Sequence, residues 1–329
     1  MLTSTDHKLF VISQLTGVGT RTVHGLSSNV AIDDMDLSEI GSLDKRVEKA
    51  ISQPGALEEA KRATDHIISQ AQSQEVQIIG PSSPLFPSQL KGLKDAPVFL
   101  YCRGDMSVVD DLPAVAIIGT RKPTKYGIKT AERITRYFAE QGWLIVSGLA
   151  LGCDSVAHRT AIEVNGKTLA VLAHGLHTIA PPMNTELAWK IVEEGGLLLS
   201  EYPLGVEPTR YQYVARDRIQ AGLCRGVVLT QSSRKGGSLH AASKSIEYGR
   251  VLAVPCPTVH DQEANRESVM ANIILTGEDD SAKAELLKLS ELEEVVNDNL
   301  FILNSKDDYS DLEKILSSRN QNVPNQNPV

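Results

Sequence analysis

The segment "VAIIGTRKPTKYG" (115–127) combines a tight turn with a cluster of positive charge. An apolar run ends there in Gly119, Thr120, Arg121 and Lys122, with Lys125 three residues further on. A dinucleotide-binding turn uses the pattern G-x-G-x-x-G, whose glycines let the pyrophosphate approach the backbone. That pattern is missing from the sequence, and so is a P-loop. We therefore predict no nucleotide cofactor, and we expect the cations of this turn to bind the phosphates of a polyanion.

Three further polar segments contribute small residues and hydroxyls, and two of them also contain arginine. They are "SGLALGCD" (147–154), "YQYVARDR" (211–218) and "SSRKGGSLH" (232–240). Backbone N–H groups, hydroxyls and forked guanidinium groups suit a polyanion, and tyrosine rings can stack on exposed bases. The residues of these segments that we expect to contact nucleic acid are Ser147, Gly148, Tyr213, Arg216, Arg218, Gly237 and Ser238.

Acidic and histidine side chains in the same region are expected to have structural tasks. Asp154 precedes His158 by one helical turn, and Asp217 lies between two arginines. We expect these three side chains to cap a helix or to orient neighbouring groups. His174 and His177 have no third ligand at a suitable spacing, which argues against a metal site. Because no serine–histidine–aspartate set and no paired carboxylates stand out, we predict no catalytic residues and a protein that is not an enzyme.

These polar segments follow apolar runs that alternate with helical patterns between residues 113 and 256. The expected strands are 114–119, 143–147, 168–172, 196–200, 227–231 and 251–254. The expected helices are 125–141, 153–165, 184–194, 213–224 and 238–248. Continuously apolar strands separated by helices indicate an α/β fold with a doubly wound, mostly parallel, Rossmann-like sheet. Ligands of such sheets bind at the carboxyl ends of the strands, where the polar segments lie.

The sequence divides into three expected regions. Residues 1–72 have a helical pattern and contain "LTGVGTRTVHGL" (15–26), which is typical of a helix-hairpin-helix turn that binds phosphate, or equally of a tight turn between two packed helices. Residues 73–295 contain an irregular, proline-rich beginning and then the Rossmann-like domain. Residues 296–329 are expected to form an acidic helical segment and a disordered tail.

Composition and charge indicate where the protein is expected to act and argue against a membrane protein. The net charge is −8, but the charges are segregated: residues 121–136 hold six basic residues against one acidic, and residues 256–329 hold six against fifteen. The four cysteines are scattered, which favours reduced thiols. The sequence has no run long enough for a membrane span, and its beginning lacks a signal-peptide pattern. We therefore expect a cytoplasmic protein with no membrane partner.

A set of motifs, in a fixed order, matches one family. They are "FPSQLKGLKDAPVFL" (86–100), Gly119-Thr120-Arg121, Ser147 to Asp154 with His158, "SEYP" (200–203), Arg216-Asp217-Arg218-Ile219 and Gly236-Gly237-Ser238. In these motifs the chain resembles the DNA-processing protein A (DprA/Smf) family of bacterial single-strand DNA-binding proteins. The resemblance implies a non-catalytic protein that forms a homodimer, protects single-stranded DNA and hands it to a RecA-type recombinase.

The chain departs from the family pattern at several positions. Asp217 replaces an asparagine, His240 replaces a threonine, and Pro181 replaces a tyrosine. These departures keep two other hypotheses open. One is a divergent adaptor, antitoxin or defence regulator that acts through a protein partner. The other is a Rossmann-like protein that binds a small nucleotide. Binding of labelled single- and double-stranded oligonucleotides at two salt concentrations separates the three.

Overall fold

A computed structural model describes residues 2–28 and 30–319 of the chain. It contains one nine-stranded sheet in the order β1-β2-β6-β5-β4-β3-β7-β8-β9. The strands are β1 (Gln77–Ile79), β2 (Leu100–Gly104), β3 (Ala114–Ile118), β4 (Leu144–Ser147), β5 (Thr168–Leu172), β6 (Leu197–Ser200), β7 (Gly226–Leu229), β8 (Val251–Pro255) and β9 (Leu300–Leu303). The pairs among β3 to β9 are parallel, which confirms the doubly wound α/β fold.

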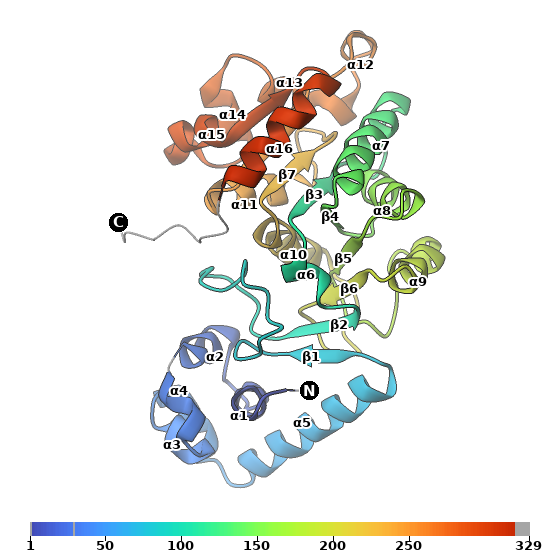
Figure 1. Cartoon of the computed structure of the whole chain (residues 1–329). Coiled ribbons are helices and arrows are strands. Elements are labelled where there is room, and N and C mark those ends of the chain that lie inside the picture. The colour runs from blue at the N-terminus through green and yellow to red at the C-terminus, as the bar shows by residue number, and fades with distance from the viewer. Residues whose placement is uncertain (1, 29, 320–329) are drawn as a thin grey trace.

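Helices cover both faces of this sheet, as Figure 1 shows. One face carries α10 (Arg210–Leu223) and α11 (Leu239–Glu247), and the other carries α7 (Lys125–Glu140), α8 (Cys153–Glu163) and α9 (Thr185–Glu193). The buried side chains fall into separate clusters, with Ile219 and Leu239 on the first face and Ile134 and Phe138 on the second. Strands covered on both faces need apolar side chains at every position, which is why they are continuous apolar runs.

The strand order reverses its direction of winding at β3. This strand pairs with β4 on one side and with β7, much later in the chain, on the other. The connection through α7 leads to β4, whereas α10 leads into β7. A gap between diverging connections therefore opens at the carboxyl end of β3, where ligands of open α/β sheets bind.

Two antiparallel strands lie in the stretch that the sequence indicates to be irregular. β1 and β2 pair with each other, and β2 continues the sheet by pairing with β6. Their lengths explain why sequence patterns miss them, since β1 has three residues and β2 has five, with a proline-rich connection between them. α6 (Val108–Asp111) follows β2 and leads into β3.

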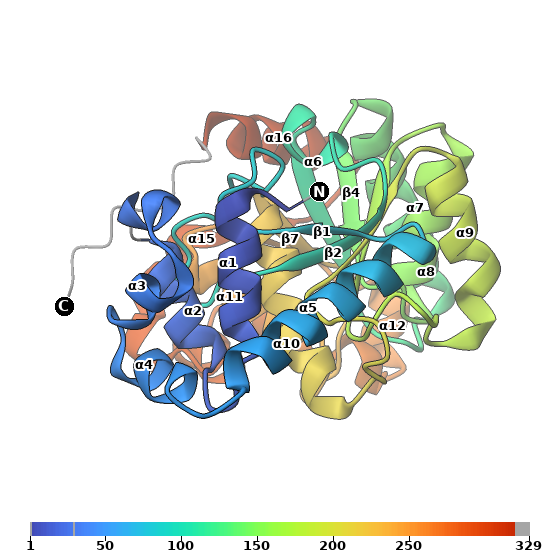
Figure 2. The same cartoon turned by 90° about the horizontal axis from the view of Figure 1, so that it is seen from below.

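The N-terminal region is helical, and its helices lie below β1 and β2 in Figure 1 and in front of them in Figure 2. Its helices are α1 (Ser4–Ser13), α2 (Thr20–Ser27), α3 (Leu37–Gly41), α4 (Lys45–Ile51) and α5 (Ala56–Ser73). Phe10 of α1 meets Phe99 edge to face with ring centroids 4.7 Å apart, so the helical cluster is continuous with the edge of the sheet. The turn between α1 and α2 contains Gly17 at a φ of 84°, a left-handed conformation that favours glycine.

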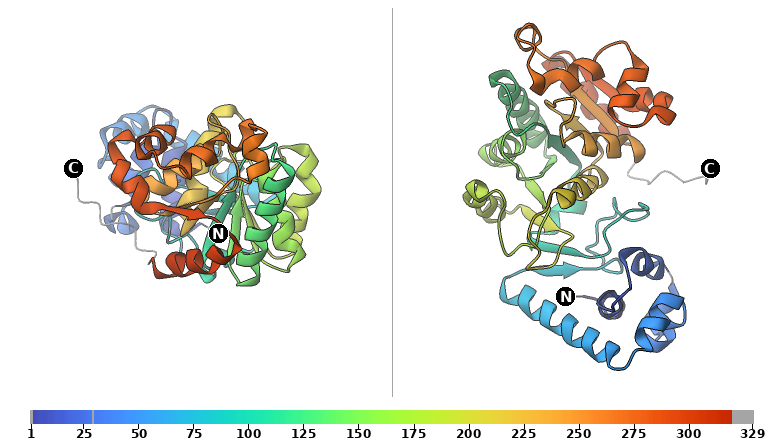
Figure 3. Two further views of the ribbon diagram at one scale, coloured as in Figure 1. Left: turned by 90° about the horizontal axis from the view of Figure 1, so that it is seen from above. Right: turned by 180° about the vertical axis from the view of Figure 1, so that it is seen from behind.

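The C-terminal region adds a strand as well as helices. After β8 come α12 (Val259–Glu263), α13 (Met270–Leu275), α14 (Asp280–Leu286) and α15 (Glu293–Asn299), which gather at one end of the molecule (Figure 3). β9 then pairs parallel with β8, and α16 (Tyr309–Ser318) packs against α7. The sequence did not indicate β9, because four apolar residues in an acidic segment are a weak strand signal.

The expected divisions after residues 72 and 295 remain proposals, and β9 lies in the same sheet as β1 to β8. The tail prediction for 320–329 falls outside the described residues. Within the part of the chain that the structure describes, no helix combines the length and the apolar character that a bilayer crossing requires.

Candidate nucleic-acid interface

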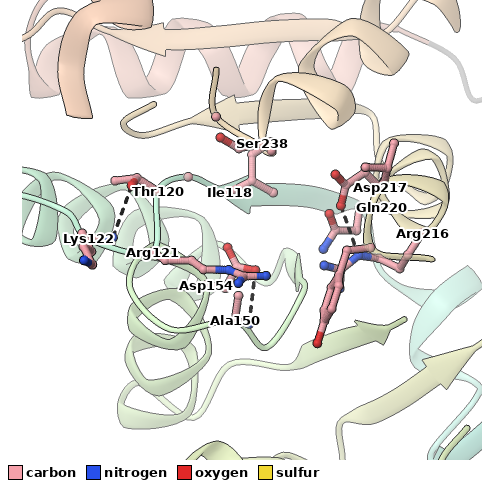
Figure 4. Close-up of a pocket in the computed structure, with 15 residues that line it drawn as sticks. Ile118, Thr120, Arg121, Lys122, Ala150, Asp154, Arg216, Asp217, Gln220 and Ser238 are labelled. Atoms are coloured by element: carbon pink, nitrogen blue, oxygen red, sulfur yellow. Dashed lines mark hydrogen bonds and ion pairs between the residues drawn. The ribbon is translucent and has the colours of Figure 1, made fainter. Parts of the chain in front are cut away.

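A hollow of about 380 Å³ lies at the carboxyl end of β3, at the point where the winding of the sheet reverses. Figure 4 shows side chains from four segments converging on it. The segments are the turn after β3, the loop after β4, one face of α10 and the loop before α11. Ten residues singled out from the sequence line this hollow: Gly119, Thr120, Arg121, Lys122, Asp154, Tyr213, Arg216, Asp217, Gly237 and Ser238.

The turn after β3 is held in place by close backbone packing. A Cβ at Gly119 would lie 2.5 Å from Thr230 Oγ1 and 2.6 Å from Cys153 Sγ, so only glycine fits where β3 passes its neighbours. Thr120 donates its N–H to the Gln231 carbonyl at 2.7 Å and accepts the N–H of Cys153 at 3.2 Å. The turn is therefore fixed from both sides before Arg121 leaves it.

Arg121 is exposed, and it makes no ion pair with any carboxylate in the described ranges 2–28 and 30–319. Its guanidinium lies over the ring of Tyr213, with Cζ 5.3 Å from the ring centroid. Lys122 is exposed beside it. A guanidinium held against an aromatic face keeps its hydrogen-bond donors at the edge free for a phosphate. This pair thus offers one charged donor group and one stacking surface at the rim of the hollow.

The loop before α11 supplies the opposite wall. Gly237 is exposed, and a Cβ there would meet open space. Ser238 donates its hydroxyl to Ser232 Oγ at 3.0 Å, which ties the loop to the end of β7. Arg234 and Lys235, also exposed, stand in the same loop. The wall therefore presents accessible backbone and hydroxyl groups next to positive charge.

Arg216 forms the floor of the hollow rather than its rim. It is only 4% exposed, and its Nη1 donates to the carbonyls of Gly148, at 3.0 Å, and Val171. Its Nε donates to Asp217 Oδ1 at 3.2 Å. A Cβ at Gly148 would collide with this guanidinium. Arg216 therefore connects the ends of β4 and β5 with α10, and most of its hydrogen-bonding capacity is already used inside the protein.

Asp154 and His158 both accept hydrogen bonds from the backbone of the loop after β4. Asp154 Oδ2 accepts the N–H groups of Gly148 at 3.2 Å and Ala150 at 3.4 Å. The N-cap of α8 is Gly152, so Asp154 does not cap the helix. Burial raises the pKa of Asp154, and Arg216 opposes that shift.

His158 is fully buried and neutral. Its Nε2 accepts the N–H of Leu149 at 3.3 Å, and its Nδ1 lies 2.7 Å from the hydroxyl of Thr168. Because the Thr168 hydroxyl donates to the Ile145 carbonyl, His158 Nδ1 carries the proton and donates to Thr168. Burial lowers the pKa of His158 to about 3, so the ring keeps this state at neutral pH. Its place is beneath the loop, away from the hollow.

Asp217 brings a titratable acid into the floor. Burial raises its pKa to about 7, and the charge of Asp154 acts in the same direction, while Arg216 and Arg121 oppose the shift. The side chain therefore titrates far above the usual range of an aspartate. A phosphate bound near Arg121 would meet either a neutral or a negative Asp217, depending on pH.

Four residues expected at the interface are not among those that line the hollow. Lys125 begins α7, exposed, and Ser147 is buried with its hydroxyl donated to the Ile117 carbonyl. Gly148 lies under Arg216. Arg218 points to the other side of α10, where it forms a two-pronged ion pair with Glu201 at 2.7 and 2.6 Å. Arg218 is thus neutralised inside the protein.

Four lining residues were not singled out by the sequence patterns: Val214 and Gln220 of α10, Ala150 of the loop after β4, and Ile118 at the end of β3. Gln220 stands three and seven residues after Asp217 and Tyr213, a spacing that places all three on one helical face. That periodicity is a signal which could have identified Gln220. Nothing comparable marks Ala150, because loop geometry decides its place.

The family described as DNA recombination-mediator protein A matches residues 77–281 of the chain. The chain belongs to this family. DNA processing protein DprA of Bacillus subtilis is 35% identical over 208 residues, which cover 63% of this chain and 70% of that protein. Protein Smf of Escherichia coli is 32% identical over 252 residues, covering 76% of this chain and 66% of that protein. The chain thus spans about two thirds of the length of these relatives.

Two solved structures of the same family resemble the fold. DprA from Streptococcus pneumoniae has a TM-score of 0.70 at 24% identity, covering 94% of this chain and 98% of that one. DNA processing protein A from Helicobacter pylori has a TM-score of 0.58 at 28% identity, covering 73% of this chain and 96% of that one. The Helicobacter pylori structure is described as giving insight into a single-stranded DNA binding mode. The resemblance seen in the sequence motifs is confirmed.

Proposed function

We propose that the chain binds single-stranded DNA without catalysing a reaction, protects it and hands it to a RecA-type recombinase. The observation that carries this proposal is the pair formed by Arg121 and Tyr213 at the rim of the hollow. A phosphate binds to the free edge of the guanidinium, and a base stacks beside it on exposed aromatic surface. Proteins that bind single strands without sequence preference combine these two contacts.

The size of the hollow and the charge around it favour the binding of a single strand over that of a duplex. The open backbone at Gly237 faces a hollow of about 380 Å³, which has room for a nucleotide of a single strand but not for a double helix. Lys122, Arg234 and Lys235 add exposed positive charge. A single strand exposes both its phosphates and its bases to such a surface, whereas a duplex buries its bases.

The hydrogen bonds of the buried side chains His158 and Asp154 agree with the proposal that the chain has no catalytic residues. His158 is neutral and already bonded on both ring nitrogens. Asp154 is bonded to backbone N–H groups. His158 does not line the hollow, and Asp154, which does, is held by these backbone N–H groups. The family description, DNA recombination-mediator protein A, supports the transfer of the bound strand to a recombinase as part of the same proposal. We also propose the homodimer that the resemblance in the sequence motifs implies.

The test is fluorescence anisotropy with labelled oligothymidylate and a duplex of equal length, at about 50 and 200 mM salt. We expect the single strand to bind more tightly and its affinity to fall steeply with salt, because binding releases counterions. Equal affinity for the duplex, or a response that does not change with salt, contradicts the proposal. Tight binding of a mononucleotide alone would instead favour a small-nucleotide protein.

Loading of a recombinase is measured separately. A RecA-type recombinase is added to a single strand coated with single-strand-binding protein, with and without this chain, and filament formation is followed. Acceleration by the chain supports the transfer step. An effect that persists without DNA binding would point to an adaptor that acts through protein contacts.

A further inference from the structure

A second hollow, of about 870 Å³, lies on the opposite side of α10 from the first. It is enclosed by the start of α2, the connection between β1 and β2, α10 and α11, and we call it the junction hollow. The right-hand view of Figure 3 shows the β1–β2 connection reaching toward the N-terminal helices. The junction hollow is thus the place where the helical region meets the sheet.

α10 separates the two hollows. Tyr211, Ala215 and Arg218 line the junction hollow. Residues at spacings of four and seven share one helical face, so this set belongs to one side of α10, while Tyr213, Asp217 and Gln220 occupy the other. The two faces meet at the N-terminal end of the helix, where Tyr211 is 80% exposed. A chain-like ligand can therefore pass from one hollow to the other over this end.

The unpaired charge in the junction hollow is positive. Its three acids all lie in ion pairs, Glu201 with Arg218 at 2.6 Å, and Asp95 and Glu247 both with the single ammonium of Lys244 at 3.1 and 2.7 Å. The four basic residues of the lining exceed these three acids by one charge. Arg21 and Lys94 are exposed, and among the described residues neither forms an ion pair. These two cations remain available for an anionic ligand.

The junction hollow also offers aromatic surface. The hydroxyl of Tyr248 is held by Asp95 at 2.5 Å, and the ammonium group of Lys244 lies 5.6 Å from the centroid of the Tyr248 ring, so that ring is fixed in the wall. Tyr202 lines the hollow as well. Tyr211 has no such partner among the described residues and stands at the rim. A rigid wall, an exposed ring and free cations are the components of a single-strand site.

The geometry points to a continuous path in which a single strand leaves the first hollow, crosses the N-terminal end of α10 and enters the junction hollow. There Tyr211 stacks on a base, and Arg21 and Lys94 bind phosphates. This inference rests on the proposed function, because it extends the same ligand. It also gives the turn before α2 a task, since that turn presents Arg21 to the strand.

If the strand follows this path, replacing residues of the junction hollow should weaken the binding of long oligonucleotides and leave the binding of short ones unchanged. Oligothymidylates of about 4 to about 16 nucleotides cover the usual range of single-strand sites. Arg21→Ala combined with Lys94→Ala should leave the shortest oligonucleotides unaffected. For the long ones it should flatten the slope of log affinity against log salt by about 1.4, since each phosphate contact contributes about 0.7. Arg62→Ala combined with Lys49→Ala, two exposed cations on α5 and α4, is the matched control.

Tyr211 is tested by a pair of variants. Tyr211→Ala should weaken binding of long oligonucleotides about 10-fold, whereas Tyr211→Phe should retain the affinity because stacking needs only the ring. In the unaltered protein, 5-iodouridine placed at successive positions should photocrosslink to Tyr211 only in oligonucleotides that extend past the first hollow. This second measurement needs no variant and so does not depend on folding of an altered chain.

The failures are distinguishable. If Arg121→Ala weakens binding at all lengths while the junction variants bind long strands normally and no crosslink forms at Tyr211, the path is wrong and the proposed function stands. If no single strand of any length binds the unaltered chain, both the proposed function and the path are wrong.

Discussion

Arg121 and Arg216 carry the same charge, but burial gives them different tasks. The first is exposed at the rim over Tyr213, and the second is 4% exposed and holds two backbone carbonyls. A charged side chain most of whose donors are used within the protein contributes to the shape of a site. One whose donors are free contributes to binding.

Replacing these two arginines separately should therefore separate binding from stability. Arg121→Ala should weaken single-strand binding by about 1.5–3 kcal/mol, or about 10- to 150-fold, with an unchanged melting temperature. Arg216→Ala should lower the free energy of unfolding by about 3–5 kcal/mol, because it leaves Asp217 and buried carbonyls without their partner. Thermal melting and anisotropy on both variants test this. A folded Arg121→Ala protein with unaltered affinity contradicts the phosphate-binding assignment.

Asp217 predicts a pH dependence with a defined sign. Its pKa is raised to about 7 in the folded chain, against about 3.9 for an unfolded aspartate. The folded state thus binds more protons between these values, and the contribution of Asp217 to stability is full below about pH 4 and is lost as the pH rises through about 7. Because protonation also removes a negative charge beneath the bound phosphate, affinity for single strands should rise severalfold from about pH 8 to about pH 6.

The control for this pH dependence is Asp217→Asn, which places the amide of the family pattern in the floor. This variant should bind with a weaker pH response over the same range and should melt at a higher temperature than the original chain at about pH 8. A pH response that Asp217→Asn leaves unchanged would assign the titration to another group, such as an exposed histidine.

At the scale of elements, the position of the turn that carries Arg121 is fixed by close contacts of the end of β3 with the end of β7 and the start of α8. Gly119→Ala introduces a Cβ 2.9 Å from the Gln231 carbonyl oxygen and still closer to Thr230 and Cys153. We expect a loss of about 1–3 kcal/mol in the free energy of unfolding, as for other overpacked sites. Gly237→Ala is the matched substitution, since its Cβ meets open space. Chemical denaturation of both should show a loss only for Gly119→Ala; equal stability of the two would mean that the turn can shift.

The strands and helices that position the site were predictable because their patterns are local. Continuous apolar runs between 114 and 255 located β3 to β8, and Gly119 marked the end of β3. Residue types also identified Arg121 and Tyr213, which do meet. Helical spacing places Arg218 on the side of α10 that carries Tyr211 and Ala215, but its ion pair with Glu201 of a distant segment could not be foreseen. β9 also could not be foreseen from a local pattern, because its four residues form a strand by pairing with the edge of β8, which lies far from it in the sequence.

At the scale of the whole molecule, the C-terminal helix completes the core on one face of the sheet. Leu312 of α16 is fully buried in a cluster with Phe138 and Trp143, whereas the Lys314 side chain is 74% exposed. Leu312→Ala should cost about 2–5 kcal/mol in the free energy of unfolding, and Lys314→Ala should change it by less than about 0.5 kcal/mol. Equal stability of these variants by chemical denaturation would show that α16 packs only weakly on the sheet.

The contact between α16 and the sheet has an optical consequence. Of the two tryptophans in the chain, Trp143 is buried and donates its indole N–H to Glu313 of α16 at 3.2 Å, whereas Trp189 is 44% exposed and lies against Arg103. The emission of a tryptophan responds to the polarity around its indole ring. In a Trp189→Phe chain the remaining fluorescence therefore comes from Trp143 alone, and a red shift at constant far-ultraviolet circular dichroism records release of α16 without any attached dye.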